Sequence, residues 1–172
     1  SLALDILQEI MSGGASSRLY KSLVVEKKKA VSIHFSYNGN MLDYGTIYIV
    51  AMPAPNVTPK EIETLIDDEI QKIITESVTE SEVKEAIRRF QDSVIFSRDS
   101  LSGPAMIIGQ ALTTGSTLDD IENWPQNISA ITTKEIHEAT TKYINPKNPW
   151  IRKPINAYLY PKIKKTENHN EQ

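Results

Sequence analysis

Apolar residues recur every three or four positions at the start of the chain, a spacing that places them on one face of a helix. They are Leu2, Ile6, Leu7 and Ile10. The pair Gly13 and Gly14 follows, and glycine adopts the left-handed conformation of a helix end at little cost. The pattern therefore predicts a helix that ends at this glycine pair.

A second helix is expected directly after the glycine pair. Ser16 or Ser17 can cap its N-terminus, and its apolar residues are Leu19, Leu23 and Val24. A run of lysines follows, where cations suit the negative end of a helix dipole.

The pattern then changes to a period of two, which is typical of a strand with one buried face. The apolar set is Val31, Ile33, Phe35 and Tyr37. The polar set between them is Ser32, His34 and Ser36. After a loop that begins at Asn38, residues 44–52 read as a second strand that is apolar on both sides. Together they predict an antiparallel hairpin with a long loop.

Capping boxes mark the starts of three later helices. Each pairs a threonine with a glutamate three residues on, at Thr58–Glu61, Thr79–Glu82 and Thr132–Glu135. Each such cap stabilises a helix by about 1 kcal/mol. Between the second and third boxes, residues 102–112 read as an apolar helix, and a short helix capped by Thr117 should end near Trp124.

The last predicted element is a strand over Ile155–Tyr160, which follows two prolines. Strands and helices thus come in runs rather than in alternation, which indicates an α+β fold with helices packed on a mostly antiparallel sheet. We expect three or more strands and five to seven helices. One domain should span residues 1–161, followed by a polar tail over 162–172.

Composition narrows the function without naming it. The 172 residues are 40% hydrophobic and 24% charged, with a net charge of −3, so nothing indicates a nucleic-acid-binding surface. The chain contains no cysteine, which excludes disulfides and thiolate metal sites. No apolar run reaches the roughly 18 residues that a membrane span needs.

A search for catalytic chemistry finds none. The histidines His34, His137 and His169 are far apart, whereas a zinc enzyme needs about three protein ligands. We expect His137 to be a solvated helix residue beside Glu135 and Glu138. Gly13 and Gly14 ahead of two serines could hold an anion at a helix N-terminus, but a turn and cap is the favoured interpretation. No catalytic, metal-ligating or substrate-binding residue is therefore predicted.

The order of segments nevertheless resembles one known family, the pitrilysin-type zinc metalloproteases, which include the mitochondrial processing peptidases. The resemblance covers roughly residues 2–161. The segments that carry it are Gly13–Tyr20, Asn56–Ile62, Val78–Val83, Asp99–Ala105 with Gly109 and Gly115, Ile131–Ile136, and Tyr158–Pro161.

In that family two similar α+β halves close around a peptide, and only the first half carries the zinc motif His-x-x-Glu-His. This chain resembles the second, metal-free half. The resemblance implies a non-catalytic domain in the wall of a peptide-binding chamber. It implies zinc in a missing N-terminal half, and contacts with that half and with a second family subunit. It also implies that a first strand is missing before Ser1, which would leave an open sheet edge and could let the domain self-associate.

Some family members carry an arginine and a tyrosine, seven positions apart, that support the substrate carbonyl. The matching positions here are Val24 and Val31, which cannot donate hydrogen bonds. The resemblance therefore implies that the parent carries the zinc and that a partner supplies this pair. A scaffold subunit without proteolytic activity and a plain protein-interaction module are the alternatives. The bacterial periplasm or cell envelope is the favoured location.

Overall fold

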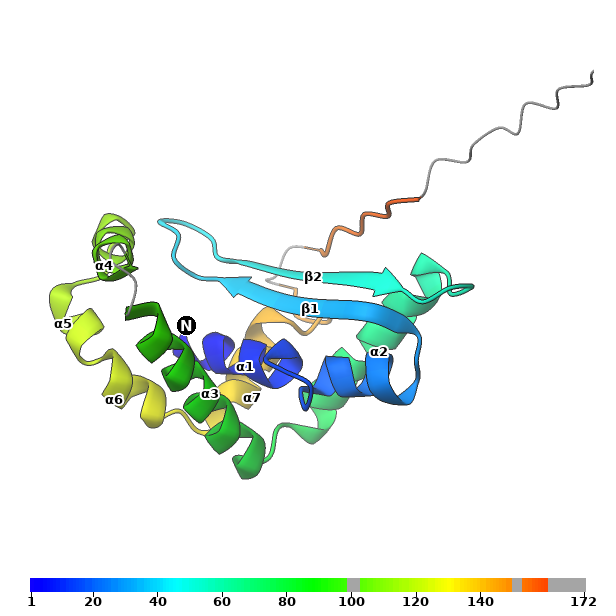
Figure 1. The fold of residues 1–172 in the computed structure, drawn as a ribbon, viewed down its shortest axis with the longest axis horizontal. Coiled ribbons are helices and arrows are strands. Elements are labelled where there is room, and N and C mark those ends of the chain that lie inside the picture. The colour runs from blue at the N-terminus through cyan, green and yellow to red at the C-terminus, as the bar shows by residue number, and fades with distance from the viewer. Residues whose placement is uncertain (99–102, 150–152, 161–172) are drawn as a thin grey trace, which may run out of the picture.

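The computed structural model describes residues 1–98, 103–149 and 153–160. Its elements are two strands, seven α-helices and one π-helix (Figure 1). In chain order they are α1 (Leu2–Ser12), η1 (Tyr20–Glu26), β1 (Ala30–Asn38), β2 (Thr46–Pro53), α2 (Pro59–Glu76), α3 (Glu80–Arg98), α4 (Gly103–Thr113), α5 (Leu118–Glu122), α6 (Trp124–Ser129) and α7 (Thr133–Tyr143).

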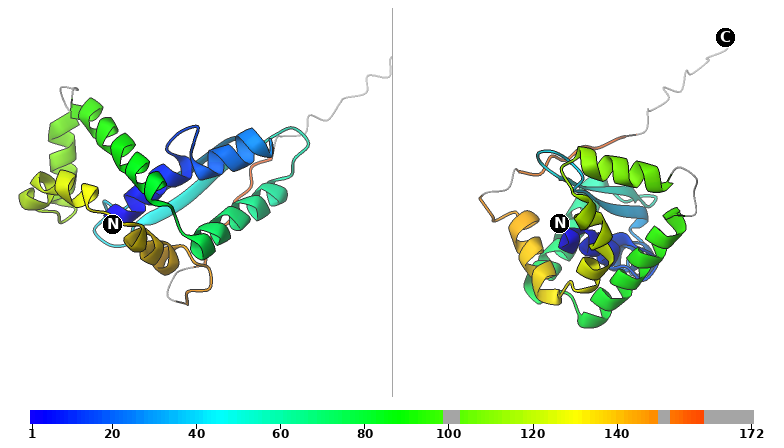
Figure 2. Two further views of the ribbon diagram at one scale, coloured as in Figure 1. Left: turned by 90° about the horizontal axis from the view of Figure 1, so that it is seen from below. Right: turned by 90° about the vertical axis from the view of Figure 1, so that its left-hand side faces the viewer.

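The two strands form an antiparallel hairpin, in register from Asn38 opposite Thr46 to Ala30 opposite Pro53. Helices α1, α3 and α7 lie on one face of this sheet, and the view from below in Figure 2 shows them in front of the strands. The predicted α+β class is confirmed. The expectation of at least three strands is wrong for the part of the chain that the structure describes, which holds a two-stranded sheet.

Helix α1 is the centre of the hydrophobic core. It packs against β1, α3 and α7, and its predicted apolar face is buried, with Ile6 and Leu7 fully shielded from solvent. Phe35 from β1 and Ile136 from α7 are shielded to the same degree. Burying one such side chain stabilises the fold by about 1.5–3 kcal/mol, so α1 holds the sheet and the helical layer together.

Polar side chains of α1 also cover part of the free edge of β1. The Ser12 hydroxyl accepts from the Phe35 amide at 3.0 Å and donates to the Phe35 carbonyl at 2.8 Å. The Tyr37 amide donates to the Gln8 side chain at 2.6 Å. The expected open edge is therefore closed at Phe35 and Tyr37, because a helix supplies the partners that a neighbouring strand would supply.

A β-bulge changes the predicted face of the first strand. Val31 was expected beside Ile33 in the core, but the pairing shifts between Ala30 and Ser32, and Val31 is 54% exposed. An extra residue in one strand turns the chain locally, so the period of two is lost at this end while Ile33 and Phe35 remain buried.

The second predicted helix differs from expectation in type and in its cap. It is a π-helix, closed by a bond from the Lys27 amide to the Ser22 carbonyl at 2.9 Å. Neither serine caps it, because the Ser17 hydroxyl donates to the Gly14 carbonyl at 2.6 Å. The apolar residues Leu19 and Leu23 are fully buried, as expected.

The capping boxes largely behave as predicted. Thr132 with Glu135 bonds in both directions at the start of α7, and Thr79 with Glu82 does the same before α3. At α2 only half of the box forms: the Glu61 amide donates to the Thr58 hydroxyl, whereas the Glu61 carboxylate pairs with Lys29 at 2.9 Å.

The predicted final strand is absent. Residues 153–160 have no regular secondary structure, and Leu159 is 97% exposed. A strand requires a partner for its backbone groups, and neither β1 nor β2 pairs with this segment. Instead the side chains of Asn156 and Tyr158 donate to the Glu63 carboxylate on α2. The predicted tail over 162–172 lies outside the described residues.

Two carboxylates join distant segments through multiple charged hydrogen bonds. Arg18 bonds both oxygens of Glu82, at 2.6 and 2.8 Å, and also the Ser77 carbonyl. These bonds hold the pKa of the Glu82 carboxyl at about 2, below its ordinary value of 4.5.

Glu69 on α2 is the second such carboxylate, and it is almost fully buried. One of its oxygens accepts from Ser22 at 2.7 Å and from Lys27 and Lys72 at 2.9 Å each. Burial alone would raise its pKa, but these bonds outweigh burial and lower the pKa to about 2. The network joins α2 to η1.

Replacing Glu82 by glutamine should destabilise the fold in a pH-dependent way. The Glu82→Gln variant should lose about 1–3 kcal/mol of unfolding free energy at pH 7, since it loses charged hydrogen bonds. The native pKa is about 2 and the ordinary value 4.5. The loss should therefore be complete above pH 4.5 and disappear as the pH falls toward 2. Urea unfolding across this range measures it.

The matched control is Glu80→Gln, which changes an exposed carboxylate in the first turn of the same helix. Its unfolding free energy should stay within about 0.5 kcal/mol of the parent. Equal losses in the two variants would mean that the Arg18 contacts contribute nothing specific.

Candidate functional site

The glycine pair forms a tight turn between α1 and η1. The residue that ends α1 is Gly13, with φ at −75°, so the predicted left-handed helix end is wrong at this position. Gly14 instead has φ at +153°, a conformation that side-chain-bearing residues rarely adopt. A Cβ at Gly13 would lie 2.5 Å from the Glu9 carbonyl oxygen, so Gly13 is needed for close backbone approach.

One of the two serines that could have bound an anion at this loop, Ser17, is already hydrogen-bonded within the loop. The Ser17 hydroxyl is buried against the Gly14 carbonyl, so it is not directed at a ligand. The turn interpretation is the one that this geometry supports.

Arg18 has a role that the sequence did not reveal. It follows the glycine turn, and its guanidinium contacts Glu82 and Ser77 more than fifty positions away. A bidentate arginine–carboxylate pair fixes geometry as well as energy. The turn is thereby attached to the start of α3. The next residue, Leu19, is fully buried in the core.

The histidines are not gathered into a site. His34 is exposed on β1, and His169 lies outside the described residues. His137 was expected to be solvated, but it is half-buried on α7, and its Nδ1 is buried without a hydrogen-bond partner. The sequence alone did not indicate that this nitrogen is buried. The Glu135 carboxylate is engaged by Thr132.

No group of three His, Cys, Asp or Glu side chains within the described ranges is placed to hold a metal ion. The positions Val24 and Val31 lie on η1 and at the start of β1, with Val24 packed against the core. Their assignment as substituted substrate-binding positions stays a prediction.

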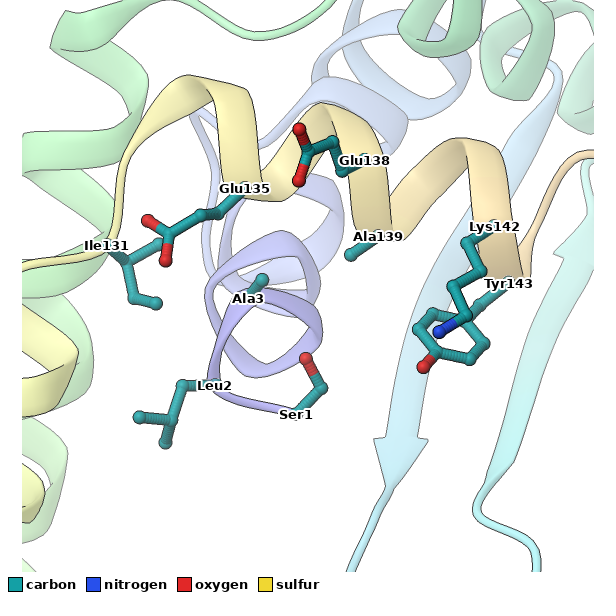
Figure 3. A pocket seen from close by; sticks show the side chains of 9 residues that line it. All are labelled: Ser1, Leu2, Ala3, Ile131, Glu135, Glu138, Ala139, Lys142 and Tyr143. Atoms are coloured by element: carbon teal, nitrogen blue, oxygen red, sulfur yellow. The ribbon is translucent and has the colours of Figure 1, made fainter.

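A shallow groove of about 370 Å³ lies between the first turn of α1 and helix α7 (Figure 3). Its apolar lining comes from Leu2, Ala3, Ile131 and Ala139. Its polar lining comes from Ser1, Glu135, Glu138, Lys142 and Tyr143. The Lys142 ammonium lies 5.0 Å from the centre of the Tyr143 ring. The groove thus combines an apolar floor with two carboxylates and one ammonium group.

A second surface is apolar and broad. It consists of outward side chains of the hairpin together with exposed residues of α4, and we call this set of residues the uncharged face. Residues 105–110 are all exposed, so α4 is open to solvent all around. Its apolar members are Val31, Tyr48, Val50, Met52, Met106, Ile107, Ile108 and Leu112. All are at least 39% exposed. In Figure 1 the strands and α4 lie above helices α1, α3 and α7, and the segment 153–160 runs above the strands on the same side.

The sequence matches a known protein family over about half of its length. Residues 1–90 match the family described as "Peptidase M16 inactive domain". The chain belongs to this family. The predicted relation to the pitrilysin-type zinc proteases is thereby confirmed. The matched part contains the glycine turn, Arg18, the hairpin and the start of α3.

Solved structures share the fold of this M16 inactive domain at low sequence identity. A protease from Helicobacter pylori aligns with a TM-score of 0.73 and 19% identity, over 81% of this chain and 33% of its own. The inactive peptidase domain of a zinc protease from Bordetella parapertussis aligns at 0.71 and 14%, over 81% and 73%. The periplasmic protease PqqL from Escherichia coli aligns at 0.62 and 17%, over 81% and 15%.

The M16 inactive domain studied here thus spans about a third of the Helicobacter protease and a smaller share of the Escherichia one. No curated protein matches it significantly. Across the described ranges, none of its helices has the length and apolar character required to cross a membrane.

The glycine turn gives a direct test of this geometry. A Gly13→Ala variant should lose about 1–3 kcal/mol of unfolding free energy, because its methyl group meets the Glu9 backbone. Gly109→Ala in α4 is the matched control. A Cβ there meets nothing within 4 Å, so this change should be neutral or stabilising by up to about 1 kcal/mol. Urea unfolding measures both, and a Gly13→Ala variant as stable as the parent would contradict the close approach.

Proposed function

We propose that this chain is the non-catalytic C-terminal domain of a zinc-dependent peptidase subunit. In that subunit it forms part of a peptide-binding chamber and of the subunit interface. The observation that carries the proposal is the match of residues 1–90 to the peptidase M16 inactive domain.

The chemistry is then supplied from outside this chain. Zinc would be bound by a separate N-terminal half, and the side chains here would position peptide. The side chains of Val24 and Val31 carry no hydrogen-bond donors, so support for the substrate carbonyl would come from a second family subunit. The structures that resemble this one support such an arrangement, because two of them are much longer than this chain.

Two surfaces are suited to these contacts. The groove between α1 and α7 is lined by Ser1, Leu2 and Ala3 from the first turn of α1. The uncharged face is broad enough to meet a peptide or a neighbouring domain, and apolar surfaces of this kind mark interaction sites in soluble proteins. We assign the chamber to the uncharged face and an inter-domain contact to the groove.

The periplasm or cell envelope of a bacterium is the proposed location. The support is one structurally similar protein, the periplasmic protease PqqL.

A scaffold subunit without proteolytic activity is the second candidate, because valines at positions 24 and 31 are equally compatible with a subunit that never binds substrate.

Zinc content and peptidase activity separate the two candidates. The 172-residue chain alone should bind no stoichiometric zinc and cleave no peptide. The full subunit that contains it should bind one zinc per active half and cleave an unstructured fluorogenic peptide when its partner is present. Metal analysis and a cleavage assay, each with and without the partner, measure this. A full subunit that binds no zinc in any combination would establish the scaffold instead.

A further inference from the structure

The link between α2 and α3 contains a strained residue. Ser77, which follows α2, has φ at 65° and ψ at −166°. Glycine adopts this combination readily, whereas a residue with a Cβ does so at a cost in free energy and only where its surroundings hold it in place. The contacts of Ser77 must therefore supply a restraint.

Hydrogen bonds on both sides fix the Ser77 backbone. Its amide donates to the Ile73 carbonyl in the last turn of α2 at 3.0 Å. Its carbonyl accepts from Nη2 of Arg18 at 3.0 Å, and the next residue, Val78, is buried in the core. Arg18 also binds both carboxylate oxygens of Glu82 in the first turn of α3. One guanidinium thus holds the strained residue and the start of the next helix together.

Arg18 itself belongs to the part of the chain that precedes the hairpin. It lies between the glycine turn and η1, and its neighbour Leu19 is fully buried. The side chains of Arg18 and Glu82 are only 22% and 31% exposed, and partial shielding from water strengthens an ion pair. The Arg18 bonds therefore join the two sides of the link between α2 and α3 to a fixed point in the core.

Helices α3 and α6 are joined to each other, and we call this pair of helices the arm. The Phe90 ring packs on the Trp124 ring with centroids 5.3 Å apart. The Gln91 side chain donates to the Ser129 hydroxyl at 2.9 Å. The views in Figure 2 show the two helices on the same side of α1, and both pack against it. These contacts mean that a displacement of α3 would carry α6 with it.

We infer that Ser77 is a hinge, held under strain by Arg18, about which the arm opens from α1 as one unit. In the closed state Arg18 binds the Ser77 carbonyl and Glu82. Opening breaks these bonds and lets Ser77 relax to an ordinary conformation, so the stored strain favours opening. The buried residues Val83 and Ala86 on α3 oppose it, because opening exposes their apolar surface. This motion does not depend on the proposed peptidase role.

Amide hydrogen exchange of α3 and α6 tests the hinge, because exchange reports how often a local unit opens. Ser77→Gly removes the strain from the closed state, so both helices should exchange about three- to thirtyfold more slowly than in the parent. The exchange of α1 and the hairpin should stay the same.

A second variant, Arg18→Lys, tests whether Arg18 maintains the strain. Lysine keeps the positive charge but lacks the fork that binds Ser77 and Glu82 together, so exchange of α3 and α6 should become about tenfold faster. Ser77 is then free to relax in the closed state. Adding Ser77→Gly to Arg18→Lys should therefore no longer slow the exchange of these helices.

The matched control is Asn56→Gly, at a residue that also has a positive φ, of 67°, but precedes α2. Asparagine tolerates this conformation, so the change should alter exchange of α3 and α6 by less than about twofold with either residue at position 18. Circular dichroism verifies that each variant is folded.

Three results would overturn the hinge. The first is that Ser77→Gly does not slow exchange in the parent. The second is that it slows exchange equally with arginine and with lysine at position 18, because the strain would then be independent of Arg18. The third is an equal change in α1 and the hairpin, which would indicate unfolding of the whole domain. If Arg18→Lys does not fold, Ser77→Gly in the parent still decides by the first and third results.

Discussion

The buried contact between α1 and β1 is the constraint on which the rest of the structure depends. Figure 2 shows α1 against the sheet, with α3 and α7 alongside, and its apolar residues meet all three partners. Its polar residues Gln8 and Ser12 also bond the backbone of β1. A two-stranded hairpin alone is only marginally stable in water. The hairpin here is stable because one helix fills its inner face and satisfies part of its edge.

Charged networks then fix the outer elements around this centre. Arg18 ties the glycine turn to α3, Glu69 ties α2 to η1, and Glu63 ties the segment 153–160 to α2. The carboxylates of Glu82, which binds Arg18, and of Glu69 have a pKa of about 2, so they are ionised throughout the ordinary pH range. Ion pairs therefore add to the apolar core on the helical side, whereas the other side of the sheet carries exposed apolar groups.

Local signals in the sequence predicted the local parts of the fold. The apolar stripe of α1 and the threonine–glutamate boxes each act within a few residues, so their geometry follows from spacing alone. The bulge at Val31, the π-helix and the bonds from Ser12 to Phe35 depend on segments that meet only after folding. The strand expected over 155–160 had the correct pattern, but a pattern cannot supply the neighbouring strand that it needs.

The candidate surfaces were less predictable than the fold. The sequence predicted no catalytic residue, and that stays a prediction, whereas the family resemblance that it indicated is confirmed by the match to the peptidase M16 inactive domain. The groove beside Ser1 and the uncharged face arise from which sides of α7, β2 and α4 remain exposed. That property is not visible in a sequence whose second strand is apolar on both sides.

The placement of methionine also gives the surface its own redox chemistry. Met41, Met52 and Met106 are 49–71% exposed, while Met11 is 2% exposed. Oxidation converts a thioether to a polar sulfoxide, and solvent access decides which sulfur reacts first. A mild oxidant would therefore alter the outer side of the hairpin and α4 before it reached the core, leaving a folded domain with a more hydrophilic surface.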